Sequence, residues 1–272
     1  MEQTCSRCKN TYVHLLPPTA ATFQDIFPDD AFRAYVRDTV LEDSAVEDTV
    51  ILTKDQWTRI RNRFDVQVSY QDITSLEGLQ YFEGLNFLIC DGNQLTELPL
   101  LESPDLYYIS CGTNQLTSLN VSQLPGLRIL YCSGNQLTSL NLSANPILET
   151  LGCNYNALAE LDVSKNPALS FLDCSRNALT ELDISKNPQL TYLGCEDNRL
   201  TKLDLSANTV LECIFCGNNL LRSLDVVSDS LRSLGCTPQG PIRTDKAPVQ
   251  QSDGSYTFNL NQVLNGGDPH RV

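Results

Sequence analysis

The chain has 272 residues, of which 41% are hydrophobic and 19% charged, and its net charge is -14. These proportions allow a hydrophobic core beneath an acidic surface, which repels the phosphates of nucleic acids and anionic lipids. We therefore expect no nucleic-acid partner. No run of about 18 apolar residues is present to cross a bilayer, so we also expect no membrane insertion.

The N-terminal segment contains a pair of cysteines, Cys5 and Cys8, in the sequence TCSRCKNTYVHLLPP. A CxxC pair is half of a zinc site, and His14 is a weak candidate for a third ligand. We assign no metal to this segment and expect a disordered tail over residues 1–20, with metal binding in an intact protein left open.

Residues 21–84 are expected to form a small helical unit that leads into a strand. Thr53 and Gln56 have the spacing of a capping box, which marks the start of a helix. Val66 and Val68 then occupy the inward positions of a strand. Three apolar residues follow the capping box at helical spacing: Trp57, Ile60 and Phe64.

A short sequence repeat fills residues 85–236. Its most regular feature is one cysteine per repeat at a constant spacing, which is one residue shorter only before the last: Cys90, Cys111, Cys132, Cys153, Cys174, Cys195, Cys216 and Cys236. An asparagine lies three positions after each of the first seven cysteines: Asn93, Asn114, Asn135, Asn156, Asn177, Asn198 and Asn219. The unit LxxLxCxxNxLxxLDLSxNPx predicts seven full coils and a partial last one.

Neighbouring side chains of a strand point to opposite faces, so Leu130 and Cys132 are expected inward and Tyr131 outward. One coil cannot bury its apolar face alone, but stacked coils with parallel strands can. The asparagines are expected to bond backbone groups where the chain leaves each strand. Prolines such as Pro146 and Pro167 end any helix. The sequence therefore predicts a solenoid that is mainly β, with little helix on its convex side.

The cysteines of the repeat are expected to be buried thiols that act as small hydrophobic side chains. Disulfides between coils conflict with the inward, in-register geometry of a parallel stack. A linear ladder also lacks the tetrahedral arrangement that zinc requires. Cys213, three positions before Cys216, is expected on the outer side of its strand, where it can be oxidised.

Residues 237–272 differ from the repeats in composition. The segment TPQGPIRTDKAPVQQSDG is typical of a linker, and SYTFNLNQVL alternates like a strand. We expect a linker and an incomplete C-terminal cap, whose remainder would belong to a longer protein.

The repeat LxxLxCxxNxL resembles the constant half of a leucine-rich repeat, and LDLSxNP resembles the short bacterial subclass. The segment FQDIFPDDAFRAYVRDTV, with ITSLEGLQYF after it, resembles the N-terminal cap of internalins and related bacterial surface proteins. The resemblance implies a leucine-rich-repeat solenoid of the α/β class, with parallel strands in a curved right-handed coil behind a helical cap.

The same resemblance implies an extracellular or cell-surface location. It also makes residues 1–20 similar to the remnant of an upstream cysteine-containing repeat, so the chain, which has no export signal, is expected to be a fragment. In related proteins the cap can resemble a calcium-binding helix-loop-helix. Here the loop EDSAVEDTVILTKDQ lacks the glycine and the closing glutamate of such a site, so we expect no calcium and no cofactor.

Patterns that would indicate an enzyme are absent from the sequence. The two histidines, His14 and His270, lie near opposite ends, and neither HExxH nor a phosphate-binding glycine loop occurs. Asp173 and Glu196 are expected at neighbouring outward positions, where a glycosidase pair could lie, but as solvated carboxylates. A column of aspartates is expected to accept hydrogen bonds within turns, with cation recruitment as the alternative: Asp162, Asp183, Asp204 and Asp225.

The outward face of the strands is predicted to bind a ligand, because exposed aromatic side chains offer a large contact area at low entropic cost. The alternative is that neighbouring rings only stack and stabilise the sheet. The predicted ligand-binding residues are Phe87, Tyr108, Tyr131, Tyr155, Phe171, Asp173, Tyr192, Glu196 and Phe215.

We therefore expect a non-catalytic recognition or adhesion module, secreted or on the cell surface, that binds a protein or a carbohydrate as a monomer. Two other hypotheses are a structural spacer that displays other domains and the recognition arm of a larger effector enzyme. The spacer hypothesis predicts that serine in place of Tyr131, Phe171 and Tyr192 leaves every interaction intact.

Overall fold

A computed structural model describes residues 2–4, 11–13, 20–222, 224–226, 228, 230–236, 249–250 and 256–258. The chain forms two compact units, residues 1–137 and 138–272. The expectations for Cys5, Cys8, His14 and His270 lie outside the described residues, as do those for most of residues 237–272.

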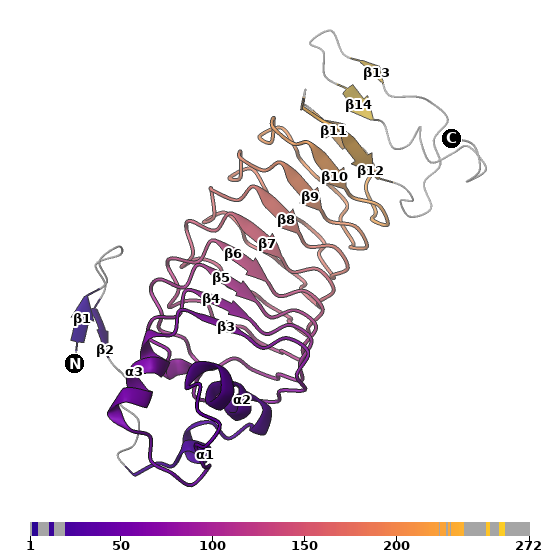
Figure 1. Cartoon of the computed structure of the whole chain (residues 1–272). Helices are drawn as coiled ribbons and strands as arrows, with labels where there is room; N and C mark the ends of the chain where they lie inside the picture. The colour runs from indigo at the N-terminus through magenta and orange to yellow at the C-terminus, as the bar shows by residue number, and fades with distance from the viewer. Residues whose placement is uncertain are drawn as a thin grey trace. The chain divides into compact units, whose positions relative to one another are not determined.

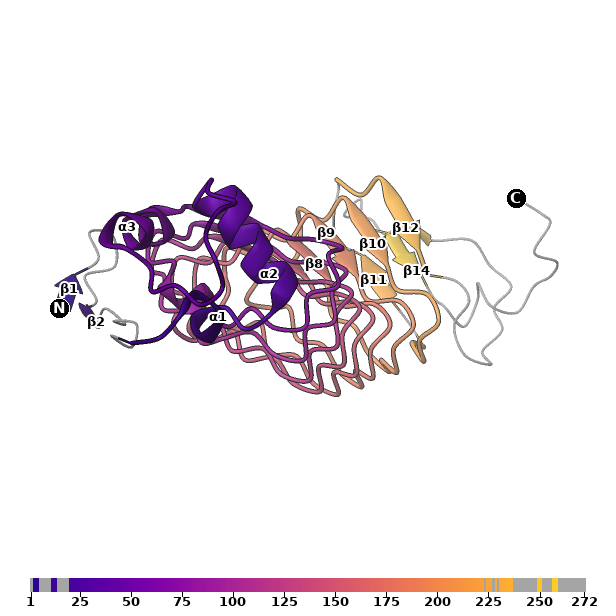
Figure 2. The ribbon, with the colours of Figure 1, turned by 60° about the horizontal axis from the view of Figure 1, so that its bottom comes forward.

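The first unit begins with a short antiparallel pair of strands, β1 (Glu2–Thr4) and β2 (Thr11–Val13), and a group of helices follows. The helical elements are α1 (Phe23–Ile26), α2 (Asp30–Tyr35), a π-helical turn (Val36–Val40) and α3 (Lys54–Asn62). They gather at the β3 end of the coils of this unit (Figures 1 and 2). The helices therefore cover the first apolar coil, as a solenoid requires.

The predicted capping box at the start of α3 is confirmed. The Gln56 amide oxygen accepts from the Thr53 N–H at 2.8 Å, and the Thr53 hydroxyl accepts from the Gln56 N–H at 3.3 Å. The expected helical position of Phe64 is wrong, because α3 ends at Asn62 and Phe64 is 61% exposed. The backbone becomes extended at Arg63, since the chain must enter the next strand at Asp65.

Four phenylalanines form the core of the helical unit, and each is at most 2% exposed: Phe23, Phe27, Phe32 and Phe82. Phe27 lies edge-on to Phe23, with 5.4 Å between ring centroids, and edge-on to Phe32 at 5.7 Å. Gly78 is required beside this cluster, because a Cβ there would lie 2.3 Å from the Phe27 ring and its φ is 100°. The core thus joins α1 and α2 to the chain that enters the first full coil.

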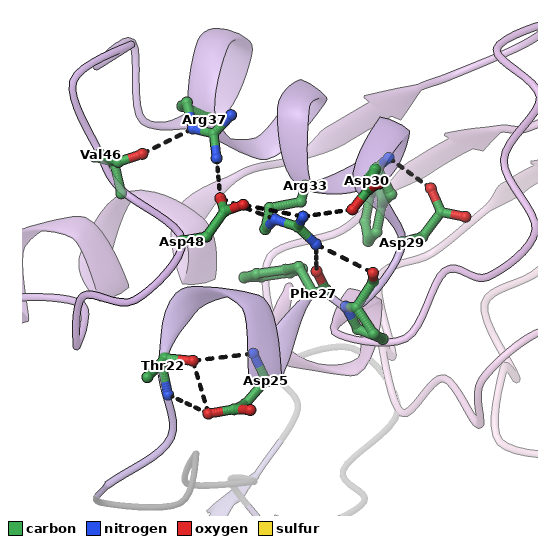
Figure 3. A network of polar contacts seen from close by, with 11 residues as sticks. Thr22, Asp25, Phe27, Asp29, Asp30, Arg33, Arg37, Val46 and Asp48 are labelled. Atoms are coloured by element: carbon green, nitrogen blue, oxygen red, sulfur yellow. Dashed lines mark hydrogen bonds and ion pairs between the residues drawn. The ribbon is translucent and has the colours of Figure 1, made fainter.

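Arg33 is only 5% exposed and organises the polar contacts of the helical unit (Figure 3). Its guanidinium donates to the carbonyl of Phe27 at 2.8 Å, and its Nε pairs with Asp48 at 3.0 Å. Arg37 pairs with the same carboxylate. Asp48 belongs to the acidic loop that was compared with a calcium site, and here its carboxylate is bonded to the two arginines instead.

The coils of the first unit carry four parallel, in-register strands: β3 (Asp65–Gln67), β4 (Phe87–Ile89), β5 (Tyr108–Ser110) and β6 (Ile129–Tyr131). A single 3₁₀ turn, Leu79–Tyr81, precedes β4. Leu130 and Cys132 are fully buried while Tyr131 is partly exposed, which confirms the predicted alternation.

The second unit continues the same pattern with β7 (Thr150–Gly152), β8 (Phe171–Asp173), β9 (Tyr192–Gly194), β10 (Cys213–Phe215) and β12 (Ser233–Gly235). These strands pair in parallel within the unit. No helix occurs among the described residues of this unit, so the path back to each strand is made of turns. A small antiparallel sheet joins β11 (Leu224–Val226), β14 (Tyr256–Phe258) and β13 (Val249–Gln250).

The predicted asparagine ladder is confirmed in both units. Asn114 donates from Nδ2 to the carbonyls of Cys90 at 3.0 Å and Cys111 at 3.1 Å, while its Oδ1 accepts from the Leu95 N–H at 3.1 Å. Asn177 makes the equivalent bonds in the second unit, to Cys153 at 3.1 Å and Cys174 at 3.0 Å. Each amide therefore ties its own coil to the preceding one.

A second asparagine ladder, which was not predicted from the sequence, lies on the return path of the second unit. Its members are fully buried: Asn145, Asn166, Asn187 and Asn208. Asn187 donates to the carbonyls of Val163 at 3.1 Å and Asn166 at 2.9 Å, and Asn208 repeats this pattern one coil later. The SxNP segment of the repeat is thus a second point of attachment between coils.

We predict that Asp48→Asn lowers the melting temperature at pH 7 by about 2 to 4 °C, because the buried Arg33 loses its bidentate partner. Hydrogen bonding from Arg33 lowers the pKa of Asp48, and such a carboxylate stabilises the fold above its unfolded pKa of about 4. This contribution is lost as the pH falls through the lowered pKa.

Melting curves at pH 7 and at pH 2.5 to 3 test this, with Asp38→Asn on an exposed side chain as the control. The difference between Asp48→Asn and the parent should shrink at the lower pH. An undiminished difference would contradict the role assigned to the ionised carboxylate.

Candidate functional site

Every other side chain of the parallel strands points away from the core, and these positions form the outward strand face. In the first unit it carries the first aromatic triad: Phe87, Tyr108 and Tyr131. Phe87 and Tyr108 stack at 4.3 Å between centroids, and Tyr131 lies 6.2 Å from Tyr108 with its ring tilted by 60°. All three rings are partly exposed. The sequence prediction of outward aromatic residues here matches the positions in the structure.

The second unit carries the second aromatic triad: Phe171, Tyr192 and Phe215. Phe171 and Tyr192 stack at 4.4 Å with nearly parallel planes, and Phe215 lies 5.8 Å from Tyr192 at an angle of 42°. These rings are also partly exposed. Cross-strand stacking stabilises a sheet, but it leaves the outer rims of the rings in contact with solvent.

Small residues on the strand face give the larger side chains of the second unit room to lean across the next strand. A Cβ on Gly194 would lie 2.8 Å from the Asp173 carboxylate, and one on Gly235 would lie 2.7 Å from the Phe215 ring. Asp173 and Phe215 therefore extend over neighbouring coils. This alternation of large and small residues was not recognised in the sequence.

Asp173 and Glu196 are both partly exposed beside Tyr192. Partial burial raises the pKa of the Tyr192 phenol, and the carboxylates of Asp173 and Glu196 add to this effect. Asp173 accepts a hydrogen bond from the Ser175 N–H at 3.1 Å. Within the described part of the chain, neither carboxylate forms an ion pair.

Tyr155 belongs to the turn that follows β7, and the residue is 52% exposed. The Arg176 guanidinium lies over this ring, 4.6 Å from the centroid. Arg176 also pairs with Asp197 at 3.2 Å, and Asp197 accepts from the Asn218 amide at 2.7 Å. Tyr155, Arg176, Asp197 and Asn218 form a row at one position of the repeat, 21 residues apart. Only Tyr155 was predicted from the sequence, because it was chosen as an aromatic residue, whereas the contacts between polar residues of successive coils were not foreseen.

All described residues at this position of the repeat share one backbone conformation. Each lies two positions after an inward cysteine, or after Val68, and has a positive φ. The values lie between 51° and 67° for Tyr70, Gly92, Thr113, Gly134, Tyr155, Arg176, Asp197 and Asn218. Only glycine adopts this left-handed region without strain. The turn that ends each strand therefore imposes the strain and fixes the direction of these side chains.

The aspartate column has the structural role that the sequence favoured. The carboxylates of Asp162, Asp183 and Asp204 accept from the N–H two positions later, at 2.8 to 2.9 Å. These bonds lower the pKa of each carboxyl. Asn120 and Asn141 make the same turn in the first and second units, respectively. The side chain of Asp225 lies outside the described residues.

The inward cysteines of the coils are buried, and the described residues contain no disulfide. Burial raises the pKa of the Cys132 thiol to about 12, which removes its reactivity at neutral pH. Cys213 is partly exposed on the outer side of β10, as predicted.

In the described part of the chain, no group of three or more histidine, cysteine or acidic side chains could hold a metal ion. None of the described helices has the length and apolar character needed to cross a bilayer.

The stacked parallel coils can be compared with solved structures. Internalin C2 of Listeria monocytogenes matches over 81% of this chain and 99% of its own, with a TM-score of 0.68 and 21% identity. A leucine-rich-repeat protein of Leptospira interrogans matches over 68% of this chain, with a TM-score of 0.63 and 22% identity. The fold is a leucine-rich-repeat solenoid.

YopM, a leucine-rich effector protein from Yersinia pestis, matches over 82% of this leucine-rich-repeat chain with a TM-score of 0.62 and 25% identity. The chain spans 51% of the Leptospira structure and 56% of YopM, so it corresponds to about half of each. No protein-family model and no curated protein matches the sequence. The predicted fold class is confirmed, and the chain is similar to internalins and other bacterial leucine-rich-repeat proteins.

We predict that Thr113→Gly raises the free energy of unfolding by about 0.5 to 1 kcal/mol, because relief of the left-handed strain exceeds the entropic cost of glycine. Chemical denaturation measures the change. Thr117→Gly is the matched control, since Thr117 has no positive φ and should lose stability. A loss of stability in both variants would show that the turn imposes no strain at Thr113.

Proposed function

We propose that this leucine-rich-repeat solenoid is a recognition module that binds a protein through its outward strand face, without catalysis. The observation that carries the proposal is the clustering of partly exposed aromatic rings on that face in both units. Aromatic residues are enriched at protein interfaces, because they bury a large area while few torsions become fixed.

The strand face is the part of each coil that is free to vary. The inward leucines and cysteines form the core, and the asparagines bond neighbouring coils. Aromatic and acidic side chains on the outward positions are thus placed without cost to the core. A rigid sheet also holds them in position before binding, which reduces the entropy lost on association.

The likeness to bacterial leucine-rich-repeat proteins supports a role in recognition. One of the solved structures is named an internalin and another is described as an effector protein. We propose by this likeness that the chain acts at the cell surface or after secretion, in adhesion or recognition. A carbohydrate ligand and a spacer role are the other outcomes that the experiment separates, and the recognition arm of a larger effector enzyme is a further alternative.

The experiment presents the intact chain to arrays of purified proteins and of glycans. Its matched variant carries Tyr131→Ser, Phe171→Ser and Tyr192→Ser, and a control variant carries Asp162→Asn and Asp183→Asn on the aspartate column. We expect protein ligands whose binding falls at least tenfold in the serine variant and is unchanged in the control.

Circular dichroism and melting curves confirm that each variant is folded. Binding that survives the serine substitutions, or no binding by well-folded protein, would contradict a recognition role of the strand face. Ligands found only on the glycan array would replace the protein partner with a carbohydrate.

A further inference from the structure

The two aromatic triads are related by a longer period than the repeat itself. Phe171, Tyr192 and Phe215 each follow their counterparts Phe87, Tyr108 and Tyr131 by the length of four coils. The position three residues before the inward cysteine, which holds the two stacked rings of each triad, varies in the other coils. There Ile129, Thr150 and Cys213 replace the rings. The longer period therefore does not follow from the requirements of the core.

The geometry of the triads is duplicated as well as the sequence. The stacked pair is 4.3 Å apart in the first triad and 4.4 Å in the second, and the third ring is 6.2 Å and 5.8 Å from the central tyrosine. In both cases the third ring is tilted, at 60° and at 42°. Stacking of the first two rings would suffice to stabilise neighbouring strands, so the tilted third ring needs another reason.

Each central tyrosine also has a carboxylate within electrostatic reach. Burial raises the pKa of Tyr108, with contributions from Tyr131 and from Asp91, as Asp173 and Glu196 contribute at Tyr192. Asp91 accepts from the Ser110 hydroxyl at 2.8 Å and from the Gly112 N–H at 2.6 Å. No described cation pairs with any of these three carboxylates.

The turns beside the strand face already show how such a combination holds a cation. Arg176 lies with its guanidinium 4.6 Å from the centroid of the Tyr155 ring and 3.2 Å from the Asp197 carboxylate. A guanidinium gains from an aromatic ring and from a carboxylate at the same time, because it is planar, charged and weakly hydrated. Each triad likewise offers aromatic rings and a nearby carboxylate, but no cation of the described chain pairs with that carboxylate.

We propose that the two aromatic triads are equivalent subsites, each of which binds an arginine side chain of a basic protein partner between its rings and the adjacent carboxylate. The proposal rests on the recognition function proposed above and specifies its chemistry. The net charge of -14 favours such a partner, since it attracts basic segments and accelerates their association.

The test uses the peptide acetyl-Gly-Gly-Arg-Gly-Gly-amide and its citrulline analogue, which has nearly the same shape but no charge. Backbone amide shifts in NMR spectra of the isotope-labelled chain report binding at each triad separately. We expect the arginine peptide to shift the amides of Tyr108 and Tyr192 with dissociation constants that agree within about threefold. The citrulline peptide should bind at least tenfold more weakly.

The second triad is then altered alone by Asp173→Asn with Glu196→Gln. We expect binding there to weaken about tenfold while the first triad is unchanged and serves as an internal control. Asp162→Asn with Asp183→Asn changes the net charge equally, and Asn120 shows that asparagine makes the same turn. This control should leave both subsites intact.

Four results would overturn the proposal: no shifts at either triad, shifts at only one, equal binding of citrulline, or equal weakening in the aspartate-column control. If the peptide fails while arrayed proteins still require the aromatic residues, the recognition function stands and only the arginine chemistry is wrong. If the arrayed proteins also fail, the recognition function itself is contradicted.

Discussion

A constant register between successive coils is the constraint on which the rest of this structure depends. A buried asparagine amide can bond the backbone of two coils only when equivalent residues of the two coils lie directly beside each other in the stack. Asn114 in the first unit and Asn177 in the second meet this condition, with bonds to carbonyls of their own and the preceding coil at 3.0 to 3.1 Å. The second ladder of Asn166, Asn187 and Asn208 imposes the same register on the return path. Because a buried amide without partners is costly, a change in coil length that shifts this register would be penalised at both ladders.

This register separates the core of each coil from its strand face. Leucines and cysteines fill the interior, where burial keeps the thiols protonated, while the outward positions are free to carry aromatic and acidic groups. In most coils the turn after the strand adds a strained, left-handed residue whose side chain is held at the edge of that face. The chemistry of the strand face can therefore change from coil to coil while the fold remains the same.

The sequence predicted those features that repeat with the coil or depend on close neighbours. The cysteine and asparagine ladders recur once in every coil, and the Thr53 capping box is a local pattern. The interactions that it missed join residues about one coil apart at variable positions, such as Arg176 with Asp197 and Asp173 over Gly194. Phe64 fits a helical pattern, but the entry into β3 ends the helix first. The aromatic residues were predicted, whereas their arrangement in two matching triads required ring geometry as well as spacing.

Deletion of a single coil tests the central constraint most directly. Removal of residues 174–194 takes out one complete period of the repeat and should preserve the register of both ladders. Removal of residues 174–183 takes out part of a coil and should break them. We expect circular dichroism to show one cooperative melting transition near that of the parent for the first deletion, and a lost or strongly lowered transition for the second. Similar melting of the two variants would contradict the claim that coil length determines this fold.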